Sequence, residues 1–228
     1  MAGTTSATSL LDACDFADYE RVVILSPHLD DAALSCTGLI DRIAGRTAVT
    51  VATICAGNPA PKPTFTRGEA RQLADETDPE RELTRRRRTE DVEAMQKLGV
   101  NYLHLGFEDA IYRRSPTSGE RIYQSSREKW VSPRIDDARH IEELFVVLRQ
   151  ICANMGPTMV VTPMGIGFHM DHAITAHVAM RLQDEAIDLL FYEDFPYVID
   201  PSAGKGIEDS PQTALERMEL QAEERFFA

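Results

Sequence analysis

The amino-acid sequence predicts an α/β protein with a mainly parallel sheet, arranged as a Rossmann-like three-layer sandwich. Short aliphatic runs, beginning at residues 22–25, alternate along the chain with longer segments of helical periodicity. Continuous apolar runs are typical of parallel strands that are covered on both faces, and their alternation with helices favours a layered α/β fold. The chain has 228 residues and no evident linker, so we predict one domain over residues 1–228.

The first part of the predicted fold is a strand, a helix and a second strand. Residues 22–25 are β-branched or aliphatic, which favours a buried strand. Aliphatic residues recur at roughly helical spacing over residues 31–44, and the pattern ends near Gly45, so we predict one helix there. Residues 48–55 form the second predicted strand, because the turn-forming sequence Gly-Asn-Pro follows it.

The rest of the chain continues this alternation around two irregular segments. We predict helices over residues 80–98, 137–154, 172–184 and 212–227, and strands over residues 102–105, 158–163 and 189–192. The first of these helices is followed by Gly99, a residue type that commonly caps helices. Residues 59–79 and 107–133 lack periodicity, and we expect the second of these segments to overhang the functional site, since long irregular segments are usually functional.

The net charge of the chain indicates which classes of partner it can bind. The formal net charge is −13, which argues against nucleic acid and against an anionic membrane as partners, because both require a basic protein surface. Small neutral or cationic ligands fit better. Residues 1–16 show neither a signal peptide nor a membrane span, so we predict a cytoplasmic protein. Assembly into a homo-oligomer stays open.

The cysteines favour neither a disulfide framework nor a thiolate zinc site. They are widely separated and form no CxxC pair, so we expect buried free thiols. The four are Cys14, Cys36, Cys55 and Cys152.

Two short motifs carry the predicted chemistry. Residues 27–31 read PHLDD and directly follow the first strand, while residues 169–172 read HMDH and follow a later strand. In open α/β sheets ligands bind at the carboxyl ends of strands, so neighbouring strands would bring the two motifs together. Catalytic zinc sites use three protein ligands and keep one position for water. We therefore select His28, Asp31 and His172 as metal ligands.

The remaining polar residues of the motifs suit proton transfer. Asp30 lies beside the ligand Asp31 and is our candidate general base toward water. His169 lies one turn before His172, where it can stabilise an oxyanion or protonate a leaving nitrogen. Together these roles predict metal-assisted amide hydrolysis.

The two motifs, in this order and context, resemble those of the PIG-L/LmbE-like zinc deacetylases, whose usual forms are PHxDD or HPDD and HxDH. Two softer segments agree with this resemblance, RRTE at residues 87–90 and LGFED at residues 105–109. The resemblance covers most of the chain. It implies an LmbE-like fold, a zinc cofactor with Fe2+ as an alternative, and an N-deacetylase acting on an amino-sugar small molecule or glycoconjugate.

The resemblance also implies roles for single residues. Zinc ligation falls to His28, Asp31 and His172, the base to Asp30, and assistance to the oxyanion or leaving amine to His169. Substrate contacts fall to Asp109, which would bind substrate hydroxyls, and to Arg88.

This chain departs from the pattern at three positions. Leu29 and Met170 replace the more usual prolines. Gly167 stands where some family members have a tyrosine, and Tyr112 or Tyr123 are the candidates to replace it.

Other interpretations stay open. Asp31 could merely cap the following helix, and the triad-like spacing of His28, Asp30 and a distant histidine also imitates an Fe(II) oxygenase, although that triad usually belongs to jelly-roll folds. A third alternative is a sugar- or metabolite-binding protein of the same fold without strong turnover. We expect five further side chains to have structural or rim positions: His104, His140, His177, Glu193 and Asp194.

Overall fold

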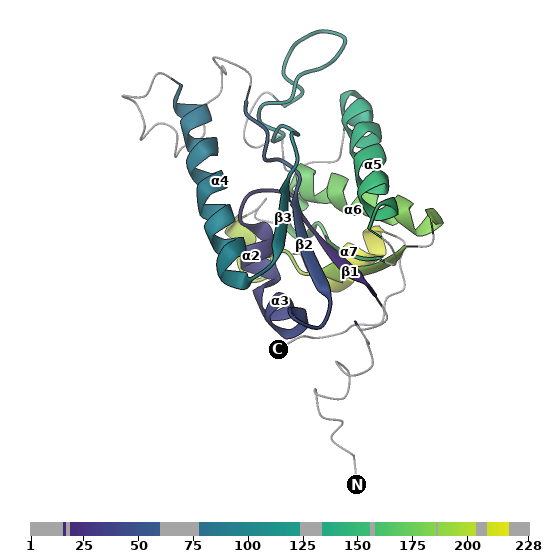
Figure 1. Ribbon diagram of the computed structural model, residues 1–228. Coiled ribbons are helices and arrows are strands. Elements are labelled where there is room, and N and C mark those ends of the chain that lie inside the picture. The colour runs from purple at the N-terminus through teal and green to yellow at the C-terminus, as the bar shows by residue number, and fades with distance from the viewer. Residues whose placement is uncertain are drawn as a thin grey trace.

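The protein is described here by a computed structural model that covers residue 16 and residues 19–59, 78–123, 134–155, 158–185, 187–203 and 209–218. Its centre is a five-stranded sheet in the order β3-β2-β1-β4-β5 (Figure 1). All four neighbouring pairs are parallel. The predicted parallel α/β fold is confirmed.

The strands lie close to their predicted positions. Their bounds are Arg21–Ser26 for β1, Ala48–Thr53 for β2, Asn101–His104 for β3, Thr158–Pro163 for β4 and Asp188–Tyr192 for β5. The central strand β1 pairs with β2 on one side and with β4 on the other, and Ile24 lies opposite Val161 in that second pair. Because β1 and β4 are parallel neighbours, the loops that follow them leave the sheet side by side.

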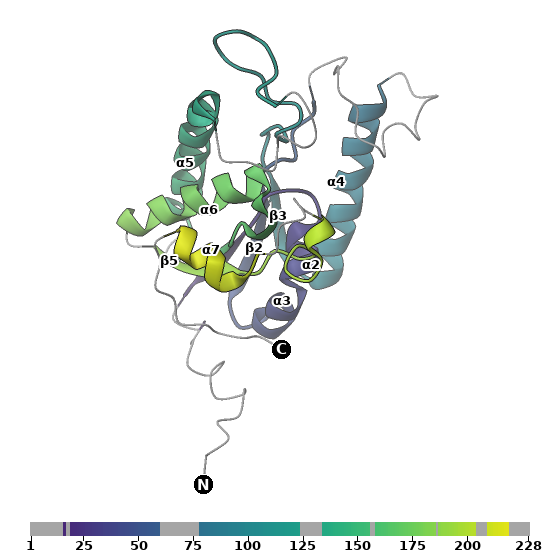
Figure 2. The same cartoon turned by 180° about the vertical axis from the view of Figure 1, so that it is seen from behind.

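Helices cover both faces of the sheet. On one face pack α5 (Ala138–Ala153) and α6 (Met170–Leu182), and on the other lie α2 (Asp31–Ser35), α3 (Thr37–Ile43) and α4 (Pro79–Leu98) (Figures 1 and 2). Alternate residues of β1 serve the two cores, because side chains of a strand point to opposite faces. Val23 and Leu25 join the core with α5 and α6, whereas Val22 and Ile24 join the core with α3 and α4.

The helix predicted over residues 31–44 is wrong in one respect, because the structure has two helices there. The chain leaves helical geometry at Cys36, with φ −116° and ψ 3°, and α3 begins at Thr37. The helix α4 agrees with its prediction and ends at Gly99, which adopts φ 69°. A left-handed backbone of this kind favours glycine.

The helix α5 lies within its predicted bounds, whereas α6 and α7 begin slightly before theirs. The helix α6 starts at Met170 because the ring of His169 caps it, accepting a hydrogen bond from the backbone N–H of Asp171. The last helix, α7, spans Pro211–Arg217, and the predicted continuation to residue 227 lies outside the described residues.

The irregular segments are only partly described. Residues 107–123 form no helix or strand longer than an isolated bridge, as predicted, while residues 60–77 and 124–133 lie outside the described part of the chain. Within that part, no helix has both the length and the apolar character needed to cross a bilayer.

Candidate metal centre

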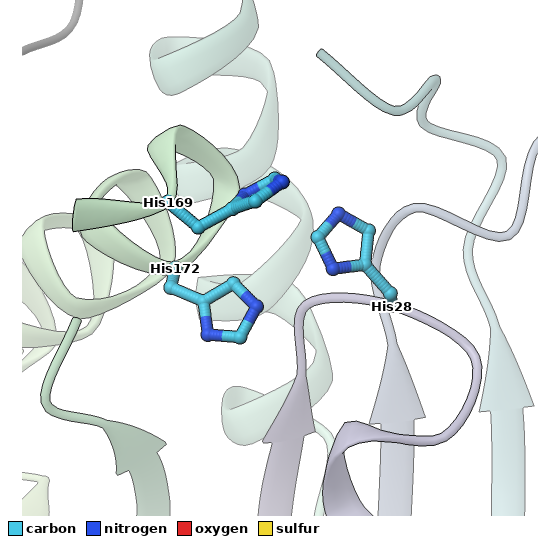
Figure 3. A group of neighbouring side chains, drawn as sticks. All are labelled: His28, His169 and His172. Atoms are coloured by element: carbon cyan, nitrogen blue, oxygen red, sulfur yellow. The ribbon is translucent and has the colours of Figure 1, made fainter. Parts of the chain in front are cut away.

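The loops after β1 and β4 bring three histidines together. His28 follows β1, whereas His169 and His172 lie at the start of α6, and Figure 3 shows the three rings gathered around one point. The ring centroids are 4.7 Å (His28–His169), 5.3 Å (His28–His172) and 5.2 Å (His169–His172) apart. Nitrogen atoms of all three rings lie within 4.8 Å of one another, so this buried group could hold a divalent metal ion.

Asp31 lies between two of these rings. Its Oδ2 is 3.2 Å from Nδ1 of His28 and 3.3 Å from Nε2 of His172, and it accepts a hydrogen bond from the backbone N–H of His28. Burial raises the pKa of this carboxyl, but His172 and His28 outweigh that effect and hold the pKa well below its usual range. Asp31 is therefore a charged oxygen donor between two imidazoles.

A buried carboxylate fixes the far side of each of these two rings. Asp171 Oδ2 lies 2.9 Å from Nε2 of His28, and Asp194 Oδ1 lies 2.6 Å from Nδ1 of His172. Histidines that bind metals are commonly oriented by such carboxylates, which leave the other ring nitrogen for the metal. In both rings the remaining nitrogen faces Asp31.

One buried nitrogen is placed as a metal ligand would be. His172 is fully buried, and its Nε2 makes no hydrogen bond within the described part of the chain. Buried polar atoms almost always have a partner, and this nitrogen faces the charged Oδ2 of Asp31. Two imidazole nitrogens and one carboxylate oxygen are a donor set that Zn2+ accepts.

The same carboxylates control the protonation of His172. Burial lowers the pKa of this ring, but Asp31 and Asp194 raise it to a net value of about 10. The surroundings thus stabilise positive charge at this position. Because metal binding requires a neutral imidazole, a cation would take the place of the proton.

His169 differs from the other two histidines. Its Nδ1 accepts the backbone N–H of Asp171 at 3.2 Å, so a neutral ring must carry its proton on Nε2. That nitrogen is then a hydrogen-bond donor and lacks the free lone pair of a ligand. The cap of α6 therefore favours proton donation by His169 over metal ligation.

Asp30 has an unusual backbone conformation, which distinguishes it from the neighbouring Asp31. Its φ is 122°, and its half-exposed carboxylate forms an ion pair with Arg87 at 2.6 Å. Such a φ is strained for a residue other than glycine and is typical of functional positions. Burial raises the pKa of Asp30, and Arg87 opposes this rise.

A small cavity lies beside His28. Its volume is about 20 Å³, enough for one water-sized group. The Oδ2 of Asp109 is 3.8 Å from Nε2 of His28, and Arg87 also lines the cavity. Arg88 lies elsewhere, because its guanidinium donates to the side chain of Asn58.

The two candidate tyrosines occupy different places. Tyr112 lines the cavity beside His28 and donates to Glu80. Tyr123 is buried and donates to Asp137 at 2.5 Å. Of the two, Tyr112 is the one at the cavity.

Three of the four cysteines lie in the described part of the chain. Cys36, Cys55 and Cys152 are buried free thiols as expected, whereas Cys14 lies outside the described residues. Burial raises the pKa of the Cys55 thiol well above its usual range, so this residue near His28 is an uncharged thiol when no metal is bound.

Two of the histidines predicted to be structural have protein partners. His104 Nε2 lies 2.8 Å from Asp91, and His140 Nε2 lies 3.2 Å from Arg113. Neither belongs to the group of histidines around His28.

The sequence interpretation missed the residues that orient the ligands. Asp194 was expected at the rim, but it is buried and contacts His172, so that expectation is wrong. Asp171 stood inside the HMDH motif without an assigned role. Arg113, which pairs with Asp171, lies in an irregular segment where no local pattern marks it.

Known proteins are similar to this chain in sequence and fold. Residues 23–183 match the PIG-L family, described as GlcNAc-PI de-N-acetylase. A 2'-N-acetylparomamine deacetylase from Niallia circulans is 32% identical over 198 residues, which cover 79% of this chain and 68% of that protein.

Two solved structures are similar as well. The zinc-inhibited form of teicoplanin deacetylase is 31% identical with a TM-score of 0.66, covering 84% of this chain and 73% of that one. A complex of a deacetylase with teicoplanin is 29% identical with a TM-score of 0.66, covering 84% and 75%.

These relatives are amide hydrolases that act on C–N bonds other than peptide bonds. The parallel sheet also differs from the jelly roll typical of Fe(II) oxygenases. The family match covers more than half of the chain, and this protein therefore belongs to the PIG-L family of de-N-acetylases.

Proposed function

We propose that the protein is a zinc-dependent N-deacetylase that removes an acetyl or related acyl group from an amino-sugar small molecule or conjugate. The main support is the buried Nε2 of His172, which faces Asp31 without a hydrogen bond in the described residues. The names of the relatives support the substrate class, since one acts on an N-acetylated paromamine and another has been captured with teicoplanin.

The proposed metal ligands are His28 Nδ1, Asp31 Oδ2 and His172 Nε2. A zinc ion held by these three residues would supply Lewis acidity and would lower the pKa of water to about 7. Asp171 and Asp194 hold the two imidazoles by their far nitrogens. This orientation would keep the donor atoms in place before substrate arrives.

The proton transfers belong to Asp30 and His169 in this proposal. Asp30 takes a proton from the attacking water, and its ion pair with Arg87 positions the carboxylate. His169, with its proton on Nε2, stabilises the developing oxyanion and then protonates the leaving nitrogen. Water adds to the carbonyl carbon, the C–N bond breaks, and acetate and a free amine leave.

Substrate contacts are proposed along the cavity beside His28. Asp109 keeps its predicted role as a partner of substrate hydroxyls, because it is buried next to His28. The contact predicted for Arg88 is better placed at Arg87, which lines the cavity.

The direct test is incubation of the zinc-loaded protein with N-acetylated aminoglycoside fragments, N-acetylglucosaminyl glycopeptides and simple N-acetylglucosaminides. Released acetate and free amine are measured together, since both products must appear in equal amounts. The variant H172A should lose zinc and activity. Binding of these compounds without release of acetate would favour a binding protein of the same fold, and unchanged zinc content in H172A would contradict the proposed ligands.

A further inference from the structure

Arg113 is a buried cation behind the candidate metal centre. It lies in the irregular segment 107–123, and only 4% of its surface is exposed. Its Nη1 forms an ion pair with Oδ1 of Asp171 and lies 3.2 Å from Nε2 of His140, while its Nε lies 3.2 Å from Oδ1 of Asp137. Burying a guanidinium is costly unless it is paired, so this placement requires its two carboxylate partners.

Asp171 connects Arg113 to His28. One carboxylate oxygen, Oδ1, serves Arg113, whereas the other, Oδ2, lies 2.9 Å from Nε2 of His28 and accepts the backbone N–H of Ala110 at 3.0 Å. Among the described residues, two of the three partners of the Asp171 carboxylate therefore come from the same irregular segment. The third partner, His28, belongs to the candidate metal centre.

We propose that Arg113 is a positioning residue, which holds the Asp171 carboxylate against Nε2 of His28 and thereby directs Nδ1 of His28 toward Asp31. This inference rests on the proposed function, since it concerns the ligand geometry of the proposed metal site. Both oxygens of the Asp171 carboxylate have partners, Oδ1 in Arg113 and Oδ2 in His28 and the backbone N–H of Ala110. The contact with Arg113 thus opposes rotation of the carboxylate away from His28.

The shape of the guanidinium distinguishes Arg113 from a lysine. Its Nη1 forms the ion pair with Asp171, while its Nε lies 3.2 Å from Oδ1 of Asp137 without a hydrogen bond in the described part of the chain. A lysine at this position offers a point charge and cannot reproduce the planar fork. Without Arg113, Oδ1 of Asp171 would lose its ion-pair partner, and the carboxylate could rotate away from His28.

The test compares the affinity of five proteins for Zn2+ and Co2+, by competition with a chromophoric chelator: wild type, R113M, R113K, D171N and the double variant R113M/D171N. Loss of an orienting partner of a metal-bound histidine typically lowers metal affinity about 10- to 100-fold. We expect R113M and D171N each to fall in that range, with R113K between R113M and wild type. The visible spectrum of the Co2+ form should change in R113M, since His28 loses its fixed orientation.

The double variant separates positioning from general destabilisation. If Arg113 acts through Asp171, R113M/D171N should bind metal no more weakly than D171N, because interacting sites are not additive. The matched control is R121M, which removes a buried arginine that donates to the backbone oxygen of Ile111 in the same segment. We expect R121M to lower thermal stability and to leave metal affinity unchanged.

The outcomes distinguish this inference from the proposed function. Wild-type protein that binds neither Zn2+ nor Co2+ would contradict the proposed function itself. Wild-type binding with unchanged affinity in R113M, additive losses in the double variant, or an equal loss in R121M would overturn the role of Arg113. If R113M does not fold, as judged by circular dichroism, R113K and D171N decide, and wild-type affinity in both overturns the inference.

Discussion

Replacing Asp194 with asparagine should weaken metal binding without removing a metal ligand. The carboxylate of Asp194 lies 2.6 Å from Nδ1 of His172, and its other oxygen accepts the backbone N–H of Ile166 at 3.0 Å. Asparagine has almost the same shape but only one acceptor oxygen. If that oxygen keeps the bond from Ile166, the amide NH2 group faces Nδ1 of His172, so the ring loses the charged acceptor that holds its proton on Nδ1 and leaves Nε2 free for a metal. Changes of this kind typically cost about 10- to 100-fold in metal affinity, which is about 1.4 to 2.7 kcal/mol.

A nearby carboxylate provides the matched control for D194N. Asp209 is also buried and accepts the backbone N–H of Gly167 at 3.2 Å, but it pairs with Arg217 and, within the described residues, has no hydrogen bond to a histidine. Zinc affinity is measured by chelator competition, and unfolding is followed with and without zinc. We expect D209N to unfold at lower temperature with unchanged zinc affinity. The reasoning is refuted if D194N binds zinc like the wild type, or if D209N loses affinity equally.

Three further predictions follow from the same geometry. D30A should keep its zinc and lose deacetylation, and near-normal turnover would remove Asp30 as the base. R87M should lower kcat/KM at least tenfold more than R88M, because only Arg87 lines the cavity; equal losses would contradict this. For His140, burial and then Arg113 lower the pKa to about 4, so the unfolded chain gains a proton first as pH falls below about 6.5. Relative to H140N, the wild type should lose about 2 kcal/mol of its free energy of unfolding between pH 7 and pH 5. Parallel pH profiles of the two proteins, measured by urea unfolding, would contradict this.

Local sequence patterns predicted where helices and strands form. They did not predict where a helix is interrupted or which side of a helix faces the site. The continuous apolar run at residues 22–25 is a buried central strand because both of its faces pack against helices. The break at Cys36 was missed, since the spacing of aliphatic residues continues across it. In the arginine run of α4, neighbouring residues differ by about 100° around the helix axis. The sequence alone therefore could not decide between Arg87 and Arg88.

The predicted ligands and their orienting partners differ in how far apart they lie in the sequence. His28 and Asp31 belong to one loop, so their spacing already predicted a shared site. Asp194 meets His172 across 22 residues, and Arg113 meets Asp171 across 58. Such pairs form only when the sheet and helices are packed, and no local period records them. A buried carboxylate after the last strand therefore looked like a rim residue.

The arrangement makes the metal centre depend on more than its two motifs. Asp31 joins His28 and His172 on the inner side, while Asp171 and Asp194 hold the same rings from the outer side. The inner residues would set which ion binds, and the outer pair would set how firmly the nitrogens are held in place. A chain that kept both motifs but lost the carboxylate after β5 should retain the fold and bind metal weakly. Sequence matches at PHLDD and HMDH alone are thus insufficient to predict a working centre.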